Sequence, residues 1–340
     1  MFIWRDDEIG NIIASELLRA ADRGVRIHIT KDRYGISCEC SEESRKSFFH
    51  TDPTSYERLM ISALTLLYNK DLVGKLPPKQ ENGLRSLMAR HRNIEIDAGT
   101  YRYDHSKFYI FDRETLVFGG INIEDKENGK DRQGRYYHDY MVEINDKELV
   151  ERFLAKRTNP TSDMAGPFGI NIKKPVRSFE IEQRYLNLIN NAQQSLTILM
   201  AYFSPEPAFI DAISRAAQRG VKIRIAVPAK ANFTDDTNKR TLKILRRTCG
   251  VNTELYLSPK MLHAKLLMSE SEITVGSSNI NKKAFRQLDE LNLFTENDNS
   301  PFAQSVRESV EAGISESLRV TDTGMLANNP LFALAERILM

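Results

Sequence analysis

The chain has 340 residues, 41% of them hydrophobic and 28% charged, which is an ordinary globular composition and enough length for two domains. Its net charge of +2 excludes the general basic footprint of a nucleic-acid-binding protein and leaves open only a local basic groove. No apolar run approaches the ~20 residues of a membrane-spanning helix, and the first residues lack a signal-peptide pattern. The three cysteines are expected to be reduced intracellular thiols.

A helix, a glycine and a strand are predicted in the same order in both halves. Apolar residues at helical spacing over 12–21 lead through Gly24 to an alternating strand over 25–29. The second half repeats this order over 209–225, with Gly220 in the place of Gly24. Each glycine is expected to end its helix in the left-handed conformation. Helices that alternate with single strands predict a mixed α/β sheet with both faces covered.

Three more segments complete the elements of the first half and the end of the chain. A helix is predicted over 55–68, capped by Thr54 or Ser55, before Pro77-Pro78 breaks the chain. A short apolar helix is predicted over 331–339, for which core packing is the main interpretation and membrane contact the alternative. Core burial is the main interpretation for three aromatic residues, and membrane contact is the alternative: Trp4, Phe48 and Phe49.

A segment rich in Pro, Gly, Asn and Ser separates the two halves. It predicts a first domain over 1–157, a linker over 158–175 and a second domain over 176–340. The second domain begins with a predicted helix over 180–191 and a strand over 195–203, which have no counterpart in the first. The first domain is therefore expected to be N-terminally incomplete or trimmed.

A short motif occurs twice and indicates one active site built from two halves. Each copy has His, then Lys two residues later, an acid after four more residues, and a glycine turn that ends in Asn. The first copy comprises His105, Lys107, Asp112, Gly119, Gly120 and Asn122. The second copy comprises His263, Lys265, Glu270, Gly276, Ser277 and Asn279.

This residue set suits a phosphodiester substrate. Residues two apart on a strand project to the same face, so each predicted strand aims one imidazole and one ammonium at the same place. The ammonium groups of Lys107 and Lys265 would bind the phosphate oxygens and stabilise the charge of the transition state. One imidazole would attack phosphorus, and the other would serve as general acid and base. Further phosphate donors are expected from Asn122, Asn279 and Ser277.

Acidic residues that follow each motif are candidates for orienting the imidazoles. Asp139 follows the first motif and Glu290 the second, and a carboxylate on one ring nitrogen raises the basicity of the other. Asp112 and Glu270 are expected to hold their hairpins together with Gly119 and Gly276, which let backbones approach closely. A zinc site on the two histidines is disfavoured because each has a lysine two residues away.

The paired motifs resemble those of the phospholipase D superfamily, and within it the bacterial cardiolipin synthase branch. The resemblance covers nearly the whole chain and is carried best by the segments 198–205, 261–265 and 275–279. It implies a two-domain α/β/α pseudo-dimer with the active site at the domain interface, no metal or other cofactor, and a phosphohistidine intermediate. It also implies that His105 is the nucleophile and His263 the acid/base, although the two motifs are nearly symmetric.

The chain departs from the family pattern at several points. Position 120 is Gly where Ser is usual, and position 270 is Glu where Asp is usual. The turn from Glu270 to Gly276 is one residue shorter than the turn from Asp112 to Gly119. The N-terminal membrane segments expected of that branch are not found. These departures are expected to affect activity or specificity more than family membership.

The leading functional prediction is a phosphatidyltransferase that passes a phosphatidyl group between phospholipid alcohols, with phosphatidylglycerol as the expected lipid. The alternatives are a phospholipase D hydrolase, a nuclease or other phosphodiesterase, and a lipid-binding scaffold without catalysis. A peripheral place on the cytoplasmic side of the cell membrane is expected. Nucleic acid is the less favoured partner, and the oligomeric state is left open.

Overall fold

The computed structural model describes residues 1–41, 47–69, 82–129, 136–159, 166–174, 177–250 and 253–339. The predicted break at Pro77-Pro78 lies outside these residues. The chain forms two compact units: Met1–Lys107 with Ile121–Tyr137, and Phe108–Gly120 with His138–Met340. Each unit is described by itself below.

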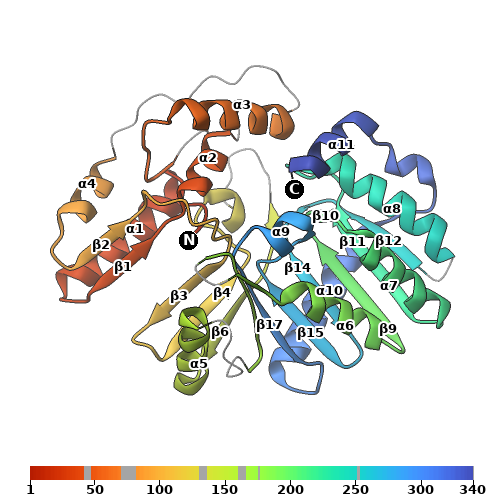
Figure 1. Ribbon diagram of the computed structural model, residues 1–340. Coiled ribbons are helices and arrows are strands. Elements are labelled where there is room, and N and C mark those ends of the chain that lie inside the picture. Colours follow the sequence, from red (N-terminus) through yellow and green to blue (C-terminus); the bar gives the residue numbers. More distant parts are fainter. Residues whose placement is uncertain are drawn as a thin grey trace. The chain divides into compact units, whose positions relative to one another are not determined.

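The larger unit is built on a nine-stranded mixed sheet. Strands β9, β11 and β12 are parallel, and the other neighbours pair antiparallel. Across the sheet the strands are β18 (Leu318–Arg319), β12 (Thr253–Ser258), β11 (Lys222–Pro228), β9 (Ser195–Met200), β14 (Lys265–Ser269), β15 (Glu272–Gly276), β17 (Glu290–Glu296), β7 (Phe168–Ile172) and β8 (Ser178–Phe179). Figure 1 shows the helices packed along this sheet.

Helices cover both faces of this sheet because its central strands are apolar on both sides. Ile198 and Met200 of β9 belong to the core with α6, α7 and α8, whereas Leu199 belongs to the core with α5 and α10. Near-continuous apolar strands of this kind are expected where both faces are buried. The helices are α5 (Lys147–Thr158), α6 (Ile181–Asn191), α7 (Pro207–Gln218), α8 (Asp235–Cys249), α9 (Lys282–Arg286), α10 (Pro301–Ser315) and α11 (Pro330–Leu339), with a 3-10 turn η4 (Thr323–Leu326).

The smaller unit contains the first helix–glycine–strand repeat. Helix α1 (Glu8–Asp22) ends before Gly24, which has φ +97° as predicted, and β1 (Ile27–Thr30) follows. Strand β1 pairs in parallel with β2 (Ile94–Asp97). The remaining elements are α2 (Arg33–Ser41), α3 (Ser55–Asn69), α4 (Gly83–Arg90) and the 3-10 turn η1 (Asp125–Asn128).

Helix α3 begins at the predicted cap. The Glu57 N–H donates to Thr54 Oγ1 at 3.3 Å, and the Thr54 N–H donates to Glu57 Oε2 at 2.7 Å. This reciprocal pair is a capping box, which satisfies two donors at the helix start.

Short strands hold the two motifs. The first motif lies on a three-stranded sheet with the order β3 (Lys107–Phe111), β4 (Thr115–Gly119) and β6 (Met141–Asn145). Two two-residue strands flank the second motif in the sequence: β13 (Met261–Leu262) directly before His263 and β16 (Ile280–Asn281) directly after Asn279. Two others are β5 (Tyr137–His138) and β10 (Phe203–Ser204).

The pairing pattern shows how the halves repeat and where they differ. Trp4 bridges Ile123 in parallel, just as Phe203 pairs with Ile280, and each isoleucine directly follows the motif Asn. In the second half β9 pairs with both β11 and β14. Among the described residues of the first half, no strand takes the place of β9, and β1–β2 forms a separate sheet. The mixed α/β fold with two repeated halves was predicted and is confirmed.

Two predictions about particular segments were wrong, and one open alternative is decided. Residues 168–172 of the predicted linker over 158–175 form β7, a fully buried strand of the large sheet. For Trp4, Phe48 and Phe49 the structure confirms core burial over membrane contact, because they are 3%, 0% and 1% exposed. Their rings pack against one another at centroid distances of 5.1–5.3 Å.

The predicted core packing of the last helix was also wrong for three of its large apolar side chains. The exposed fractions are 78% for Leu331, 52% for Leu334 and 75% for Ile338. Within the described part of the chain, no helix combines the length and the apolar composition needed to cross a bilayer.

Candidate active site

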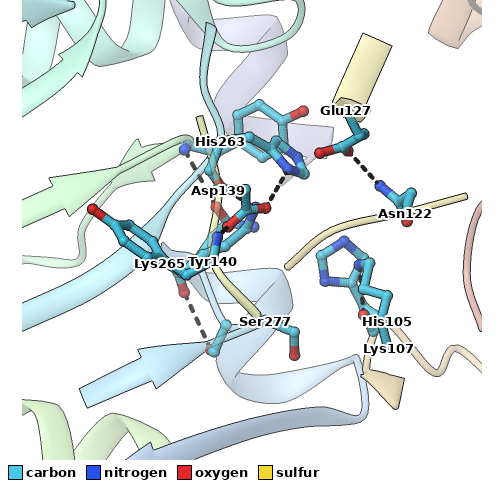
Figure 2. A network of polar contacts seen from close by, with 12 residues as sticks. His105, Lys107, Asn122, Glu127, Asp139, Tyr140, His263, Lys265 and Ser277 are labelled. Atoms are coloured by element: carbon cyan, nitrogen blue, oxygen red, sulfur yellow. Dashed lines mark hydrogen bonds and ion pairs between the residues drawn. The ribbon is translucent and has the colours of Figure 1, made fainter. Parts of the chain in front are cut away.

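The second motif places an imidazole, a carboxylate and an ammonium group in direct contact. His263 lies between β13 and β14, and Lys265 is the first residue of β14. His263 Nδ1 lies 2.8 Å from Asp139 Oδ2, and Lys265 Nζ lies 3.4 Å from the same oxygen (Figure 2). The predicted orienting role of Asp139 thus acts on the histidine of the other motif, 124 positions away in the sequence.

Burial and charge make this contact rigid. Lys265 is fully buried, and Asp139 is buried between the imidazole and the ammonium group. Burial by itself would raise the pKa of Asp139, but the charge of Lys265 and the hydrogen bond from His263 lower it. Asp139 Oδ1 also accepts the Tyr140 N–H at 2.8 Å. The carboxylate is therefore ionised, and with Nδ1 as its donor, Nε2 of His263 is the nitrogen that can exchange a proton.

The residue beside each acid differs between the halves. An added Cβ on Gly120 would lie 2.2 Å and 2.5 Å from the two oxygens of Asp139, so there is no room for any side chain at position 120. In the second half, Ser277 Oγ donates to Glu290 Oε2 at 2.5 Å. The longer Glu leaves space for the Ser hydroxyl, whereas the shorter Asp brings its carboxylate against the backbone of Gly120. Glycine at position 120, in place of the usual serine, therefore leaves room for the Asp139 carboxylate.

Polar groups around the second motif fix the predicted phosphate donors. The Asn279 Oδ1 accepts the Tyr202 N–H at 3.3 Å, which leaves the Nδ2–H donors to serve a ligand. The Tyr202 ring meets the His263 ring edge-on at 5.8 Å. The Ser277 hydroxyl serves Glu290, so its role toward phosphate stays a prediction, as does the orienting role of Glu290.

The first motif is arranged around an aromatic ring of the smaller unit. The Phe2 ring meets the His105 ring edge-on at 4.8 Å, and Lys107 Nζ lies 5.2 Å from the centre of the same ring. Lys107 Nζ donates to His105 O at 2.7 Å, and Lys265 Nζ likewise donates to His263 O. The two copies therefore hold the lysine against the carbonyl of their own histidine.

A second layer of buried acids supports the backbone of the first motif. Asp32 accepts the Asp104 N–H at 2.5 Å and the Tyr34 N–H at 2.8 Å. Asp104 in turn accepts the Ser106 N–H at 3.0 Å. Burial raises the pKa of Asp32 above its usual range despite these donors. This chain of bonds fixes the backbone on both sides of His105.

Asn122 makes a contact that the sequence did not indicate. Its Nδ2 donates to Glu127 Oε1 at 3.0 Å, from η1 (Figure 2). Its Oδ1 is buried without a hydrogen-bond partner among the described residues. The predicted role of Asn122 toward phosphate stays a prediction. It requires Nδ2 either to give up its bond to Glu127 or to donate its second hydrogen to the phosphate.

The four residues predicted to hold the hairpins have different surroundings, and the Glu270 carboxylate binds the segment before β9 and not its own hairpin. A Cβ on Gly119 would lie 2.1 Å from Tyr140 O, and one on Gly276 would lie 2.2 Å from Leu291 O, so neither strand tolerates a side chain there. Asp112 and the next residue have φ 51° and 59°, which makes a tight hairpin turn of the primed type. The Glu270 carboxylate accepts three backbone N–H groups, of residues 193–195.

The arrangement in the larger unit is suited to acid–base chemistry on an anionic substrate. A buried ammonium offers charge to phosphate oxygens, and an imidazole held at Nδ1 presents Nε2 for proton transfer. The same ammonium makes the site around Asp139 a poor one for a metal cation. Sequence reasoning missed four residues that touch the motifs, because nothing in their spacing marks them: Phe2, Asp104, Glu127 and Tyr202.

Comparison with known proteins identifies the family of the chain. A family model described as a cardiolipin synthase, PLD-like domain matches residues 1–157 and 185–313, which is most of the chain. The chain therefore belongs to the phospholipase D superfamily, in its cardiolipin synthase-like branch. This family assignment confirms the resemblance seen in the paired motifs.

Relatives within the superfamily are distant. The chain is 27% identical over 317 residues to cardiolipin synthase 2 of Staphylococcus epidermidis, covering 86% of this chain and 58% of that protein. It is 26% identical over 315 residues to the cardiolipin synthase of Listeria welshimeri, covering 86% and 59%. The chain thus spans less than two thirds of the length of these relatives.

A solved structure supports the fold alone. The crystal structure of phosphatidylserine synthase from Haemophilus influenzae matches with a TM-score of 0.65 at 14% identity, covering 99% of this chain and 85% of that one. The likeness in fold to that structure thus covers nearly all of this chain.

Proposed function

We propose that this protein is a phosphatidyltransferase of the cardiolipin synthase type. It would move a phosphatidyl group from one phospholipid to the alcohol of another through a phosphohistidine intermediate. The observation that carries the proposal is the contact of Asp139 with both His263 and Lys265 in a buried place. The family and the named activities of the relatives support it.

In the first step, a ring nitrogen of His105 attacks the phosphorus of phosphatidylglycerol. A P–N bond forms, and the P–O bond to the headgroup glycerol breaks. His263 gives a proton from Nε2 to the departing alkoxide, so that glycerol leaves neutral. The ionised Asp139 stabilises the imidazolium before the transfer and keeps the imidazole tautomer afterwards.

In the second step, His263 takes the proton from a headgroup hydroxyl of a second phosphatidylglycerol. That oxygen attacks phosphorus, the P–N bond breaks, and the products are cardiolipin and unmodified His105. Lys107 and Lys265 would hold the non-bridging oxygens in both steps, assisted by the amides of Asn122 and Asn279. The chemistry needs no metal, because the lysines supply the positive charge. We place the protein at the cytoplasmic membrane surface, where this substrate lies.

The test is turnover of phosphatidylglycerol vesicles, followed by mass spectrometry of the lipids. The unmodified protein should release cardiolipin and glycerol, and neither His105→Ala nor His263→Ala should do so. His91→Ala is the matched control, because His91 is in another part of the chain and is expected to have no role. Phosphatidic acid without cardiolipin would make the protein a hydrolase, and cleavage of DNA without lipid turnover would make it a nuclease.

A further inference from the structure

The last described helix presents three of its large apolar side chains to solvent. Leu331, Leu334 and Ile338 of α11 are 78%, 52% and 75% exposed. Positions three and four apart lie on one side of a helix, so these three form one stripe. We call them the α11 stripe. Single exposed apolar residues are common, but three in one stripe on one helix are a feature that marks an interaction surface.

Hydrogen bonds to α8 keep the α11 stripe facing outward. The carboxylate of Glu336, which is fully buried, accepts the Thr237 N–H at 2.8 Å in the first turn of α8. Thr237 Oγ1 lies 3.0 Å from Ala333 O and 2.8 Å from the same carboxylate. Rotating α11 to bury the stripe would break these bonds. The Glu336 carboxylate and the Thr237 N–H would then be buried without partners, which would destabilise the fold.

The charges on the exposed sides of α8 and α11 all have one sign. Arg240 and Arg247 of α8 are exposed, as is Arg337 of α11. The acids on the described parts of the same two helices are buried or paired. Asp236 and Glu336 are 9% and 0% exposed, and Asp235 forms an ion pair with Lys239 at 2.7 Å. Figure 1 shows α11 lying along α8.

We propose that the α11 stripe and these arginines bind the surface of an anionic lipid bilayer. An interfacial helix places its apolar side chains at the headgroup–acyl boundary and its basic side chains among the phosphates. Anionic headgroups attract arginines without requiring fixed partners. The inference rests on the proposed function, because an enzyme that modifies lipids must reach them in a bilayer.

The size of the stripe favours a bilayer over a folded protein partner. A stable protein–protein interface buries ~800 Å² on each side and needs a shaped, closely packed centre. Three side chains on one ten-residue helix supply a narrow apolar stripe, and exposed arginines lie on the same two helices. A fluid anionic surface fits both. A second copy of the chain would bring arginine against arginine if it used the same face.

The test is co-sedimentation with vesicles of phosphatidylcholine, with and without phosphatidylglycerol. The unmodified chain should bind the anionic vesicles, and less well in high salt. Leu331→Ser/Leu334→Ser/Ile338→Ser should lower the partition coefficient about tenfold or more, because three apolar side chains no longer insert. Replacing Arg240, Arg247 and Arg337 by Gln should lower it about fivefold per charge at low salt.

The matched control is Ile12→Ser/Leu59→Ser/Leu87→Ser. These side chains are 42%, 71% and 59% exposed and lie on three different helices, so they match the stripe in number but not in arrangement. The control should bind like the unmodified chain. The proposal would be overturned if the stripe variant bound as well as the unmodified chain, or if the control lost as much binding as the stripe variant. It would also be overturned if the unmodified chain did not bind. Concentration-dependent self-association that the stripe variant abolishes would overturn it too.

A soluble phosphodiester separates this inference from the proposed function. The stripe variant should turn over bis(4-nitrophenyl) phosphate at the unmodified rate and lose turnover only on vesicles. If no variant turns over either substrate, the proposed function fails, and the sedimentation result still decides the membrane inference.

Discussion

Gly120 is expected to be required by Asp139, and replacing it tests how the site is positioned. Gly120→Ser introduces the hydroxyl that the family pattern has, so a comparison of sequences alone would predict a neutral or improved enzyme. The structure predicts the opposite. The new Cβ would lie 2.2 Å from Asp139 Oδ2, where ordinary contacts begin at 3.4 Å.

The carboxylate would therefore have to move by about 1 Å, and it is held from three sides. Its bonds to His263 at 2.8 Å and to the Tyr140 N–H at 2.8 Å cannot both survive such a shift. Overpacking of this kind costs about 1–3 kcal/mol in the free energy of unfolding. Loss of the carboxylate–imidazole bond should lower the rate of turnover by about 10²-fold or more, because the imidazole loses its fixed tautomer.

The double variant Gly120→Ser/Asp139→Glu copies the pairing of Ser277 with Glu290 and should recover part of both losses. Urea unfolding and lipid turnover of the four proteins in this cycle give the coupling energy, expected at about 0.5–3 kcal/mol in the favourable direction. Ser277→Gly is the matched control in the second half. If Gly120→Ser alone is as stable and active as the unmodified chain, the steric argument is refuted.

The remaining predictions concern three carboxylates. Asp139→Asn should lower the turnover rate by about 10³–10⁴-fold, and a loss of less than tenfold would remove Asp139 from the mechanism. Burial raises the pKa of Asp7 from 3.8 to about 6, so the folded chain binds a proton between pH 7 and 5 that the unfolded chain does not. The urea concentration at the unfolding midpoint should therefore rise as the pH falls from 7 to 5, and it should rise less in Asp7→Asn. An equal change of the midpoint with pH in both proteins would contradict this. Glu336→Ala should cost about 1–3 kcal/mol by leaving the Thr237 N–H unpaired, whereas the exposed Arg337→Ala should cost almost nothing.

Much of the fold could be predicted because its signals are local. The helix, glycine and strand around Gly24 and Gly220 follow from apolar spacing and from the positive φ that glycine adopts readily. The family followed from the duplicated motif. Strand β7 could not be predicted in this way, because its residues lie within a stretch rich in Pro and Gly, and only pairing with β17 reveals it.

The details of the site depend on contacts between residues far apart in the chain. Asp139 was identified as an orienting acid, but nothing in the sequence says that it holds His263 rather than a histidine of its own half. The fit between Gly120 and Asp139 depends on the length of one side chain and the absence of another. The aromatic residues Trp4 and Phe48 carry the same local signal whether they are buried or at an interface.

The central claim is that a covalent phosphohistidine forms on one motif and is released by the other. It is tested most directly by intact-protein mass spectrometry after acid-free quenching of the His263→Ala variant with phosphatidyl-4-nitrophenol, whose leaving group departs without a proton. This variant retains the nucleophile and lacks the base that activates the acceptor hydroxyl, so with this substrate the intermediate should form readily and break down slowly. The account predicts a phosphatidyl adduct that is acid-labile, maps to His105, and is absent from the His105→Ala/His263→Ala variant. No adduct on either single variant, or an adduct on another residue, would contradict it.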